Sequence, residues 1–480
     1  MAPCCPLTPP SSGIEGSERM FKRILIANRG EIALRVLRAC RELGIETVAV
    51  YSAADAEALH VQLATRAVCI GPARAADSYL NQQAIITVAL ATGCDAVHPG
   101  YGFLSENAEF ADACAGAGLT FIGPSGDTIR KAGSKAEACA RMRAAGVPTV
   151  PGSDGAVPDA DTALRLTQTV GYPVLLKASA GGGGRGIRRC DCPEDLPPAF
   201  AEARAEAVAC FHNGEMYLEK CVLKPRHIEF QILADSRGNT IHLGDRDCSV
   251  QRRNQKLIEE SPAPCLTPEL RSKMGAAAVR AARAVGYENA GTVEFLLAED
   301  GRFYFMEINT RIQVEHGVTE LVTGVDLVRE QIRIAAGLPL SRTQAEVTFT
   351  GHAMECRVNA EDPKEHFRPV PGRAAFVHFP GGCGVRVDSC LYTGCTMPPF
   401  YDSLAAKILV HAPTRLEAIR RMRRALEELT IEGFPTSAEF SYLVLHHPEF
   451  VRGTCTTAFL EEHLDELLSW GRQAEEKEAE

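Results

Sequence analysis

Three kinds of segment are missing from this sequence of 480 residues. No apolar run approaches the roughly 20 residues that a membrane-spanning helix needs. The phosphate-binding pattern G-x-x-x-x-G-K-[ST] does not occur, which excludes a P-loop nucleotide site. No C-x-x-C occurs either, although the chain has 18 cysteines. They are scattered through apolar stretches, as Cys40, Cys69, Cys94 and Cys139 are, so we interpret them as reduced core residues of a cytoplasmic protein.

Length and charge narrow the class of protein further. The chain is too long for one ordinary core, so we expect two to four domains. A composition of 45% apolar and 23% charged residues is typical of a soluble globular protein. The net charge of −10 argues against nucleic acid as a partner for the chain as a whole.

The order of strand and helix patterns predicts several domains after a disordered tail at residues 1–19, which is rich in Pro, Ser and Gly. Residues 20–133 alternate short apolar strands with amphipathic helices, which predicts a parallel α/β domain. Residues 134–340 form a second region that includes a smaller unit at about 150–222. Residues 341–465 read as a C-terminal α+β domain, and residues 466–480 as an acidic tail whose last stretch, QAEEKEAE at 473–480, is expected to be disordered.

The smaller unit contains a glycine cluster that ends an apolar strand. Gly181, Gly183 and Gly186 match G-x-G-x-x-G, but the basic, strand-like IRRC follows where a dinucleotide-binding fold has a helix. We therefore interpret the glycines as a hairpin tip whose backbone N–H groups can close over phosphates as a lid. Lys177, at the end of the preceding apolar run, needs an anion, and a nucleotide phosphate is a natural partner.

A second hairpin is predicted at residues 292–316, TVEFLLAEDGRFYFMEINTRIQVEH. Asp300-Gly301 is typical of a two-residue type I′ loop, and that loop places Glu299 opposite Arg302, Phe295 opposite Met306, and Glu294 opposite Glu307. Two facing carboxylates repel each other, which suggests a cation between them. Oxygen ligands favour Mg²⁺ or Mn²⁺. The same repulsion predicts that Glu294→Gln leaves the ligand-free protein as stable as the wild type, or slightly more stable.

Alternation along the second strand predicts one polar face, made of Glu307, Asn309, Arg311, Gln313 and Glu315. A glycine lid, a lysine placed for phosphate and facing carboxylates together indicate an ATP- and Mg²⁺-dependent enzyme. The residues alone lead to that conclusion and no further.

Five segments resemble a known family: HPGYGFLSEN, KASAGGGGRG, RDCSVQRRNQK, MEINTRIQVEH and ECRVNAED. They are similar to the biotin carboxylase component of biotin-dependent carboxylases, which has the ATP-grasp fold. The resemblance runs from about residue 20 to about residue 464, in the family's order and spacing. It implies an enzyme that phosphorylates bicarbonate with ATP and then carboxylates biotin held on a carrier protein.

The resemblance also implies residue roles. At the nucleotide, Lys135 and Lys177 would bind the phosphates, and Gly183 and Gly184 would close over them. The adenine hinge would be Glu219, Lys220, Cys221 and Val222, with His227 and Asn254 near the nucleotide. Two Mg²⁺ or Mn²⁺ ions would be held by Glu294, Glu307 and Asn309. In the carboxylation steps, bicarbonate would be bound by Lys256, Arg311, Gln313 and the Val314 backbone. Glu315 would act as the base, and Arg357 would stabilise the biotin enolate. Of these, Lys256, Arg311, Glu315 and Arg357 are the expected catalytic residues.

The sequence departs from the family's usual pattern at three places. Asn254 stands where many members have His, Gly317 follows His316 where Pro is more usual, and Gly133-Ser134 precedes Lys135 where an Asp is common. Gly317 is expected to loosen the chain directly after the proposed base. None of the three positions removes a catalytic side chain.

Partners follow from the resemblance as well. No Met-Lys-Met biotinylation motif occurs in the sequence, so we expect a separate biotin carboxyl carrier protein, carboxyltransferase subunits and a homodimer. The acceptor, which is acetyl-CoA, propionyl-CoA, another acyl-CoA or pyruvate, depends on the transferase. Two other interpretations remain open: another ATP-grasp ligase of the carbamoyl phosphate synthase type, and a non-catalytic homologue. The presence of Lys256, Arg311, Glu315 and Arg357 speaks against the second.

Overall fold

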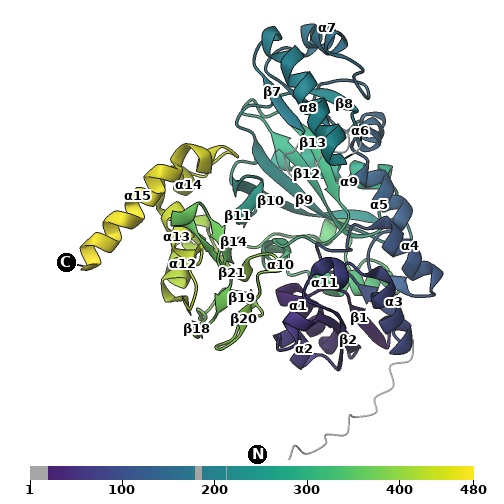
Figure 1. Ribbon diagram of the computed structural model, residues 1–480, viewed down its shortest axis with the longest axis vertical. Coiled ribbons are helices and arrows are strands. Elements are labelled where there is room, and N and C mark those ends of the chain that lie inside the picture. Colours follow the sequence, from purple (N-terminus) through teal and green to yellow (C-terminus); the bar gives the residue numbers. More distant parts are fainter. Residues whose placement is uncertain (1–19, 179–185, 212, 480) are drawn as a thin grey trace, which may run out of the picture.

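The computed structural model describes residues 20–178, 186–211 and 213–479. The first domain is a five-stranded parallel sheet in the order β3-β2-β1-β4-β5, flanked by helices (Figure 1). Ile24, Leu25 and Ile26 of its central strand have no exposed surface. The elements of this part are β1 (Arg23–Ile26), α1 (Gly30–Glu42), β2 (Glu46–Ser52), α2 (Leu59–Leu63), β3 (Arg66–Gly71), α3 (Gln82–Ala91), β4 (Ala96–His98), α4 (Ala108–Gly116), β5 (Thr120–Phe121) and α5 (Gly126–Gly133). The predicted parallel α/β domain is confirmed.

A small unit stands at one end of the molecule, at the top of Figure 1. After α6 (Lys135–Ala144), the chain forms an antiparallel sheet in the order β7-β6-β8. Two helices pack on it, and Val174, Leu176 and Leu218 belong to its own core. Its elements are α7 (Ala160–Val170), β6 (Val174–Ala178), β7 (Ile187–Cys190), α8 (Leu196–Phe211) and β8 (Met216–Lys220). We call this unit the lid.

The second and third regions share one sheet of eight strands, in the order β13-β12-β9-β10-β11-β14-β21-β19. The pairing of β11 with β14, in which Glu259 lies opposite Glu355, joins them. The strands are β9 (Arg226–Ala234), β10 (Thr240–Arg252), β11 (Gln255–Ser261), β12 (Asn289–Leu297), β13 (Phe303–Asn309), β14 (His352–Asn359), β19 (Val385–Ser389) and β21 (Leu404–Ala412). The sequence boundary near residue 340 is therefore not a boundary of the sheet.

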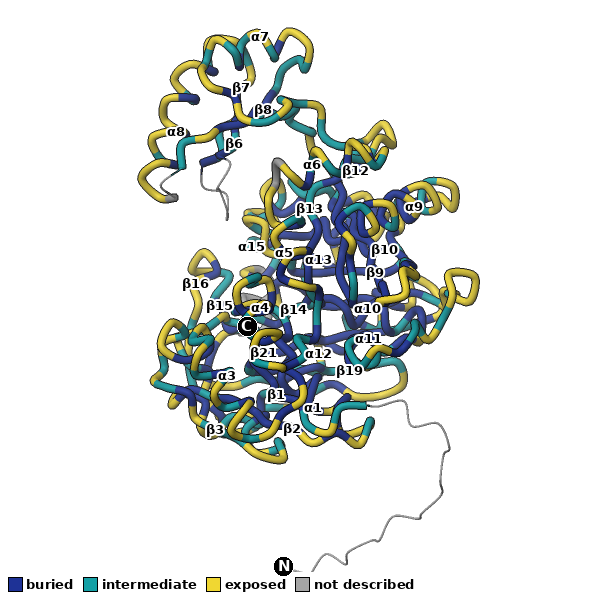
Figure 2. The backbone as a smooth tube through the Cα atoms, turned by 90° about the vertical axis from the view of Figure 1, so that its right-hand side faces the viewer, coloured by how far each residue is buried: buried dark blue, intermediate teal, exposed yellow. Residues whose placement is uncertain are grey.

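This sheet has one apolar face and one polar face. On the apolar face, Val293 and Phe295 of β12 pack with Met274 of α9 (Pro268–Ala284), and Ile408 of β21 packs with Met422 of α12 (Arg415–Glu428). The helices α10 (His316–Thr323) and α11 (Leu327–Ala335) follow β13 in the chain. Figure 2 shows the strands of this sheet as the buried centre of the molecule and α9 as partly exposed. The opposite, polar face carries the candidate site.

The C-terminal domain ends in helices, and one prediction fails there. The acidic stretch 473–480, expected to be disordered, continues α15 as far as Ala479. The remaining elements are three short ladders, β15 (Glu361–Asp362) with β16 (Arg368–Pro369), β17 (Gly372–Arg373) with β20 (Thr396–Met397), and β18 (Phe376–His378) with β22 (Thr430–Glu432), followed by α13 (Ala438–His446), α14 (Pro448–Arg452) and α15 (Phe459–Ala479). The prediction rested on the acidic composition of the tail alone. Leu460 and Leu467, earlier in the same helix, pack in the core and hold α15 in place.

The predicted hairpin exists, but its register has two irregularities that cancel. The loop is one residue longer than expected: Ala298 N–H donates to the Arg302 carbonyl, and Gly301 takes the positive φ. Phe295 therefore pairs with Phe305 and not with Met306, and Glu299 does not face Arg302. A register shift between Glu294 and Phe295 then restores the predicted pairing, so that Glu294 does face Glu307.

Candidate active site

A polar row crosses four strands of the shared sheet. Glu307 of β13 lies opposite Glu294 of β12, which lies opposite Glu229 of β9, which lies opposite Arg246 of β10. Glu294, Glu229 and Arg246 are buried. Three acids in a row need cations, and Arg246, with no exposed surface, bonds Glu229 directly. Arg246 also donates to Gln313 Oε1 at 2.9 Å.

Lys256 lies at the centre of the site. Its ammonium contacts three buried carboxylates, Glu315 Oε1 at 2.6 Å, Glu229 Oε2 at 2.7 Å and Glu294 Oε1 at 3.2 Å. Burial alone would lower the pKa of this lysine, but the surrounding anions raise it well above its ordinary value. Lys256 therefore stays a fixed cation.

Glu294 is held by protein cations on both of its oxygens. Besides Lys256, the His227 Nε2 lies 3.0 Å from Oε2, while Asn309 and Gln313 donate to Oε1 at 2.9 and 2.7 Å. Burial alone would raise the pKa of Glu294, but Lys256 and His227 hold it well below its usual range. A depressed pKa means that the surroundings stabilise the charged form. The contacts with Lys256 and His227 therefore favour the opposite outcome to the one expected from repulsion by Glu307 alone, and we expect Glu294→Gln to lower stability.

Glu315 is clamped between two cations. Its Oε1 accepts from Lys256, and its Oε2 accepts from Arg357 at 2.9 Å. Arg357 in turn donates through Nε to Glu259 Oε1 at 2.6 Å. Although burial opposes ionisation, Lys256 and Arg357 hold the pKa of Glu315 well below its usual range. The carboxylate is thus ionised and oriented, as a base waiting for its proton must be.

Arg311 and Gln313 lie on the irregular segment between β13 and α10, next to Glu294. Arg311 donates through Nε to Glu106 Oε2 at 3.0 Å and through a terminal nitrogen to Asn309 Oδ1 at 3.2 Å. Gln313 links Arg246 to Glu294 by the contacts given above. A planar cation and an amide beside an ionised carboxylate can hold a small oxyanion.

The lid supplies other residues that were predicted for a nucleotide. Lys177 of β6 forms an ion pair with Glu219 of β8, so in this structure the anion beside the lysine is a carboxylate. The Lys220 ammonium donates to the Tyr172 carbonyl at 2.6 Å, and the Cys221 N–H donates to the Pro173 carbonyl at 2.9 Å. Val222 follows them in the chain. Lys135 begins α6, and Gly183 and Gly184 lie outside the described residues.

Two of the three departures from the family pattern have a structural reason. Arg253 and Asn254 form the two-residue tip between β10 and β11, both with positive φ, where Asn is well tolerated. The tip is exposed. Gly317 lies so close to β21 that a Cβ would stand 2.3 Å from Leu409 Cδ2. Gly317 therefore allows α10 to pack tightly on the sheet, which is a packing reason for a glycine at this position.

The donor set at the hairpin fits a hard divalent cation. Glu294 and Glu307 face each other on neighbouring strands, and Asn309 is bonded to Glu294. Carboxylate and amide oxygens are the ligands that Mg²⁺ and Mn²⁺ prefer. Since Lys256 and His227 also contact Glu294, an ion there would share this carboxylate with them.

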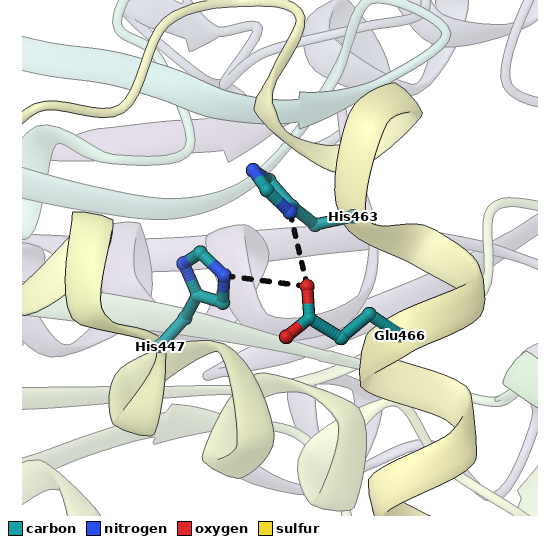
Figure 3. A group of neighbouring side chains, drawn as sticks. All are labelled: His447, His463 and Glu466. Atoms are coloured by element: carbon teal, nitrogen blue, oxygen red, sulfur yellow. Dashed lines mark hydrogen bonds and ion pairs between the residues drawn. The ribbon is translucent and has the colours of Figure 1, made fainter.

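A second group of potential ligands, His447, His463 and Glu466, joins α14 to α15 (Figure 3). The His447 Nδ1 accepts the Glu449 N–H at 3.3 Å, which leaves its proton on Nε2, facing Glu466 Oε2 at 3.8 Å. The His463 Nδ1 lies 3.2 Å from the same oxygen, and its Nε2 lies 3.3 Å from Glu449 Oε1. Both rings are thus engaged with protein groups, and we interpret the cluster as a contact that fixes α15.

Four residues of the active site were missed by reasoning from the sequence. They are Glu106, Glu229, Arg246 and Glu259. The alternation of His227, Glu229 and Gln231 along β9 was a usable signal, because it marks a second polar strand face. Glu106 lies in HPGYGFLSEN, one of the five segments that carry the resemblance.

Comparison with known proteins identifies the class. Family models match residues 20–129 as "Biotin carboxylase, N-terminal domain", 134–343 as "Carbamoyl-phosphate synthase L chain, ATP binding domain" and 355–462 as "Biotin carboxylase C-terminal domain". The biotin carboxylase of a Nostoc species is 57% identical over 92% of this chain and 99% of that protein. Biotin carboxylase 1 of Bacillus subtilis is 56% identical over 92% of this chain and 98% of that protein.

Solved structures agree. The biotin carboxylase domain dimer of Hydrogenobacter thermophilus 2-oxoglutarate carboxylase, in complex with MgADP, ADP and bicarbonate, is 51% identical, with a TM-score of 0.88 over 93% of this chain and 98% of that chain. The biotin carboxylase of Campylobacter jejuni is 47% identical, with a TM-score of 0.89 over 92% of this chain and 99% of that chain. Fold and site define an ATP-dependent ligase with the ATP-grasp fold. Within that class, the chain belongs to the biotin carboxylase family.

Proposed function

We propose that this protein catalyses the first half-reaction of a multi-subunit biotin-dependent carboxylase. ATP phosphorylates bicarbonate to give carboxyphosphate and ADP. The carboxyl group then passes to N1 of biotin on a separate carrier protein, and phosphate is released. The observation that carries this proposal is the position of Glu315, ionised between Lys256 and Arg357 and close in the chain to Arg311 and Gln313.

The contacts support a division of roles. Lys256, Arg311, Gln313 and the Val314 backbone bind bicarbonate, and Glu315 removes its proton, so that a bicarbonate oxygen attacks the γ-phosphate. Arg357 stabilises the biotin enolate, because a fixed cation in a buried site stabilises developing negative charge. Lys135, Lys177, Gly183, Gly184, His227, Asn254 and the hinge at residues 219–222 bind the nucleotide.

Glu294, Glu307 and Asn309 hold two Mg²⁺ or Mn²⁺ ions, which neutralise phosphate charge when bound. Arg246 and Glu229 keep this side of the site rigid through their buried ion pair.

Assembly and location complete the proposal. The protein acts as a homodimer with a biotin carboxyl carrier protein and carboxyltransferase subunits, as the named dimer of a relative suggests. Among the described residues, no helix is long and apolar enough to cross a membrane. Cys40, Cys94 and Cys114 are buried free thiols, the state that the reducing cytoplasm maintains, which supports a cytoplasmic location.

ATP turnover with and without bicarbonate and free biotin tests the proposal. We expect slow hydrolysis that requires Mg²⁺ and bicarbonate and that free biotin stimulates. Hydrolysis that responds to an ammonia donor and ignores biotin would indicate a ligase of the carbamoyl phosphate synthase type. Binding of MgATP without any turnover would indicate a non-catalytic homologue.

A further inference from the structure

Lys407, on the C-terminal strand β21, reaches the segment that carries the base. It has no exposed surface, and its ammonium donates to the Val314 carbonyl at 2.8 Å. We propose that Lys407 is a positioning residue that holds the peptide bond between Val314 and Glu315, and through it the base and the bicarbonate contact. This inference rests on the proposed function, because it assumes that Val314 and Glu315 act on bicarbonate.

The segment needs such support because it has no regular structure of its own. β13 ends at Asn309 and α10 begins at His316, so no ladder or helix fixes residues 310–315. The imidazole of His316 contacts the Gln313 carbonyl through Nδ1 at 2.9 Å, which fixes the peptide bearing the Val314 N–H. Lys407 fixes the next peptide. The contacts made by His316 and Lys407 together fix the direction of the Val314 N–H and the position of the Glu315 Cα.

Sheet register places Lys407 for this role. Lys407 lies directly opposite Arg357 on the neighbouring strand β14. Arg357 holds the carboxylate of Glu315, and Lys407 holds the carbonyl of the residue before it. Two adjacent cations on one sheet face therefore bind consecutive residues of the segment. Arg357 binds the side chain of Glu315, and Lys407 binds the backbone carbonyl of Val314.

Lys407 has acidic neighbours as well as the Val314 carbonyl, and the carbonyl is its nearest partner. Glu31 Oε1 of α1 lies 3.2 Å from the ammonium, and Asp388 Oδ2 lies 3.8 Å away, engaged with Arg386 at 2.7 Å. The contact with Val314 is shorter than either. Glu31 belongs to the first domain and Lys407 to the third, so this ion pair joins the two domains beside the segment 310–315.

Steady-state kinetics of Lys407→Met and Lys407→Arg test the proposal. We expect kcat/KM for bicarbonate to fall by about 10²-fold in Lys407→Met, because a displacement of about 1 Å at a reacting group costs that much. The KM for ATP and the thermal shift caused by MgATP should stay within about twofold of the wild type, since the nucleotide contacts are elsewhere.

Lys407→Arg separates positioning from charge compensation. Arginine keeps the buried charge but cannot place one donor where the lysine ammonium lies, so the bicarbonate defect should persist. Wild-type kinetics in Lys407→Arg would overturn the proposal, and so would an equal loss of ATP and bicarbonate affinity. If Lys407→Met does not fold, the Lys407→Arg result decides alone.

Arg415→Met is the matched control. Arg415 forms an ion pair with Glu260, a β11 residue, at 2.6 Å, and it donates to the Val451 and Phe450 carbonyls, away from the segment 310–315. It should lower stability and leave the KM for bicarbonate unchanged. A wild-type enzyme whose ATP turnover ignores bicarbonate would refute the proposed function itself. A bicarbonate-dependent wild type with unaffected Lys407 variants would refute only the positioning role.

Discussion

Replacing Glu294 by Gln separates the two forces that act on this carboxylate. Glu307 repels it, while Lys256 at 3.2 Å and His227 at 3.0 Å attract it. A hydrogen bond to a charged group contributes about 1.5–3 kcal/mol. Lys256 keeps two other carboxylate partners in the variant, so we expect a net loss of about 2 kcal/mol in the free energy of unfolding without ligand.

Urea unfolding of both proteins, with and without MgATP, measures this. At a ligand concentration of 100 times Kd the wild type should gain about 2.7 kcal/mol, and Glu294→Gln should lose most of that gain. Because the pKa of Glu294 is depressed, its contribution is present above the unfolded value of about 4.3 and is lost as pH falls through the folded value. The difference in the free energy of unfolding between the wild type and Glu294→Gln should therefore become smaller only at acidic pH.

Glu299→Gln, in the exposed turn of the same hairpin, is the control and should change stability by no more than about 0.5 kcal/mol. A Glu294→Gln protein as stable as the wild type would show that repulsion from Glu307 dominates. A full response of that variant to MgATP would show that Glu294 does not hold the metal.

Three further substitutions have distinct expected outcomes. Glu315→Gln should keep the stabilisation by MgATP and lose about 10²–10⁴-fold of bicarbonate-dependent turnover, measured as ADP release, because it removes the base and leaves the proposed metal ligands in place. Arg357→Met should reduce biotin carboxylation by about 10²–10³-fold while the KM for ATP stays within about twofold; a loss of ATP affinity alone would contradict its role at the enolate. Glu260→Gln tests the C-terminal domain. Burial would raise the pKa of Glu260, but His352 and Arg415 lower it to about 2, so urea titrations should show the variant less stable by about 3 kcal/mol at pH 7, with the difference vanishing as pH falls from about 4 to 2.

Local pattern was enough for several features. The alternation of β13 and the turn near Gly301 predicted that Glu294 faces Glu307, because side-chain direction and hairpin pairing depend on neighbours in the chain. The prediction reached the right pair by the wrong route, since a longer loop and a register shift cancel. The parallel α/β domain followed in the same way from strand and helix periods.

Only the tertiary structure decided which side chains meet in the site. Lys256 reaches Glu294 and Glu315 because β11 lies between β10 and β14 in a sheet whose strand order departs from chain order. Strand order depends on packing between distant segments, which no local period reports. The same strand order places Lys407 opposite Arg357, within hydrogen-bond distance of the Val314 carbonyl. It also changes the stability effect that we expect from Glu294→Gln, because the cations beside this carboxylate come from strands β9 and β11 and not from its own hairpin.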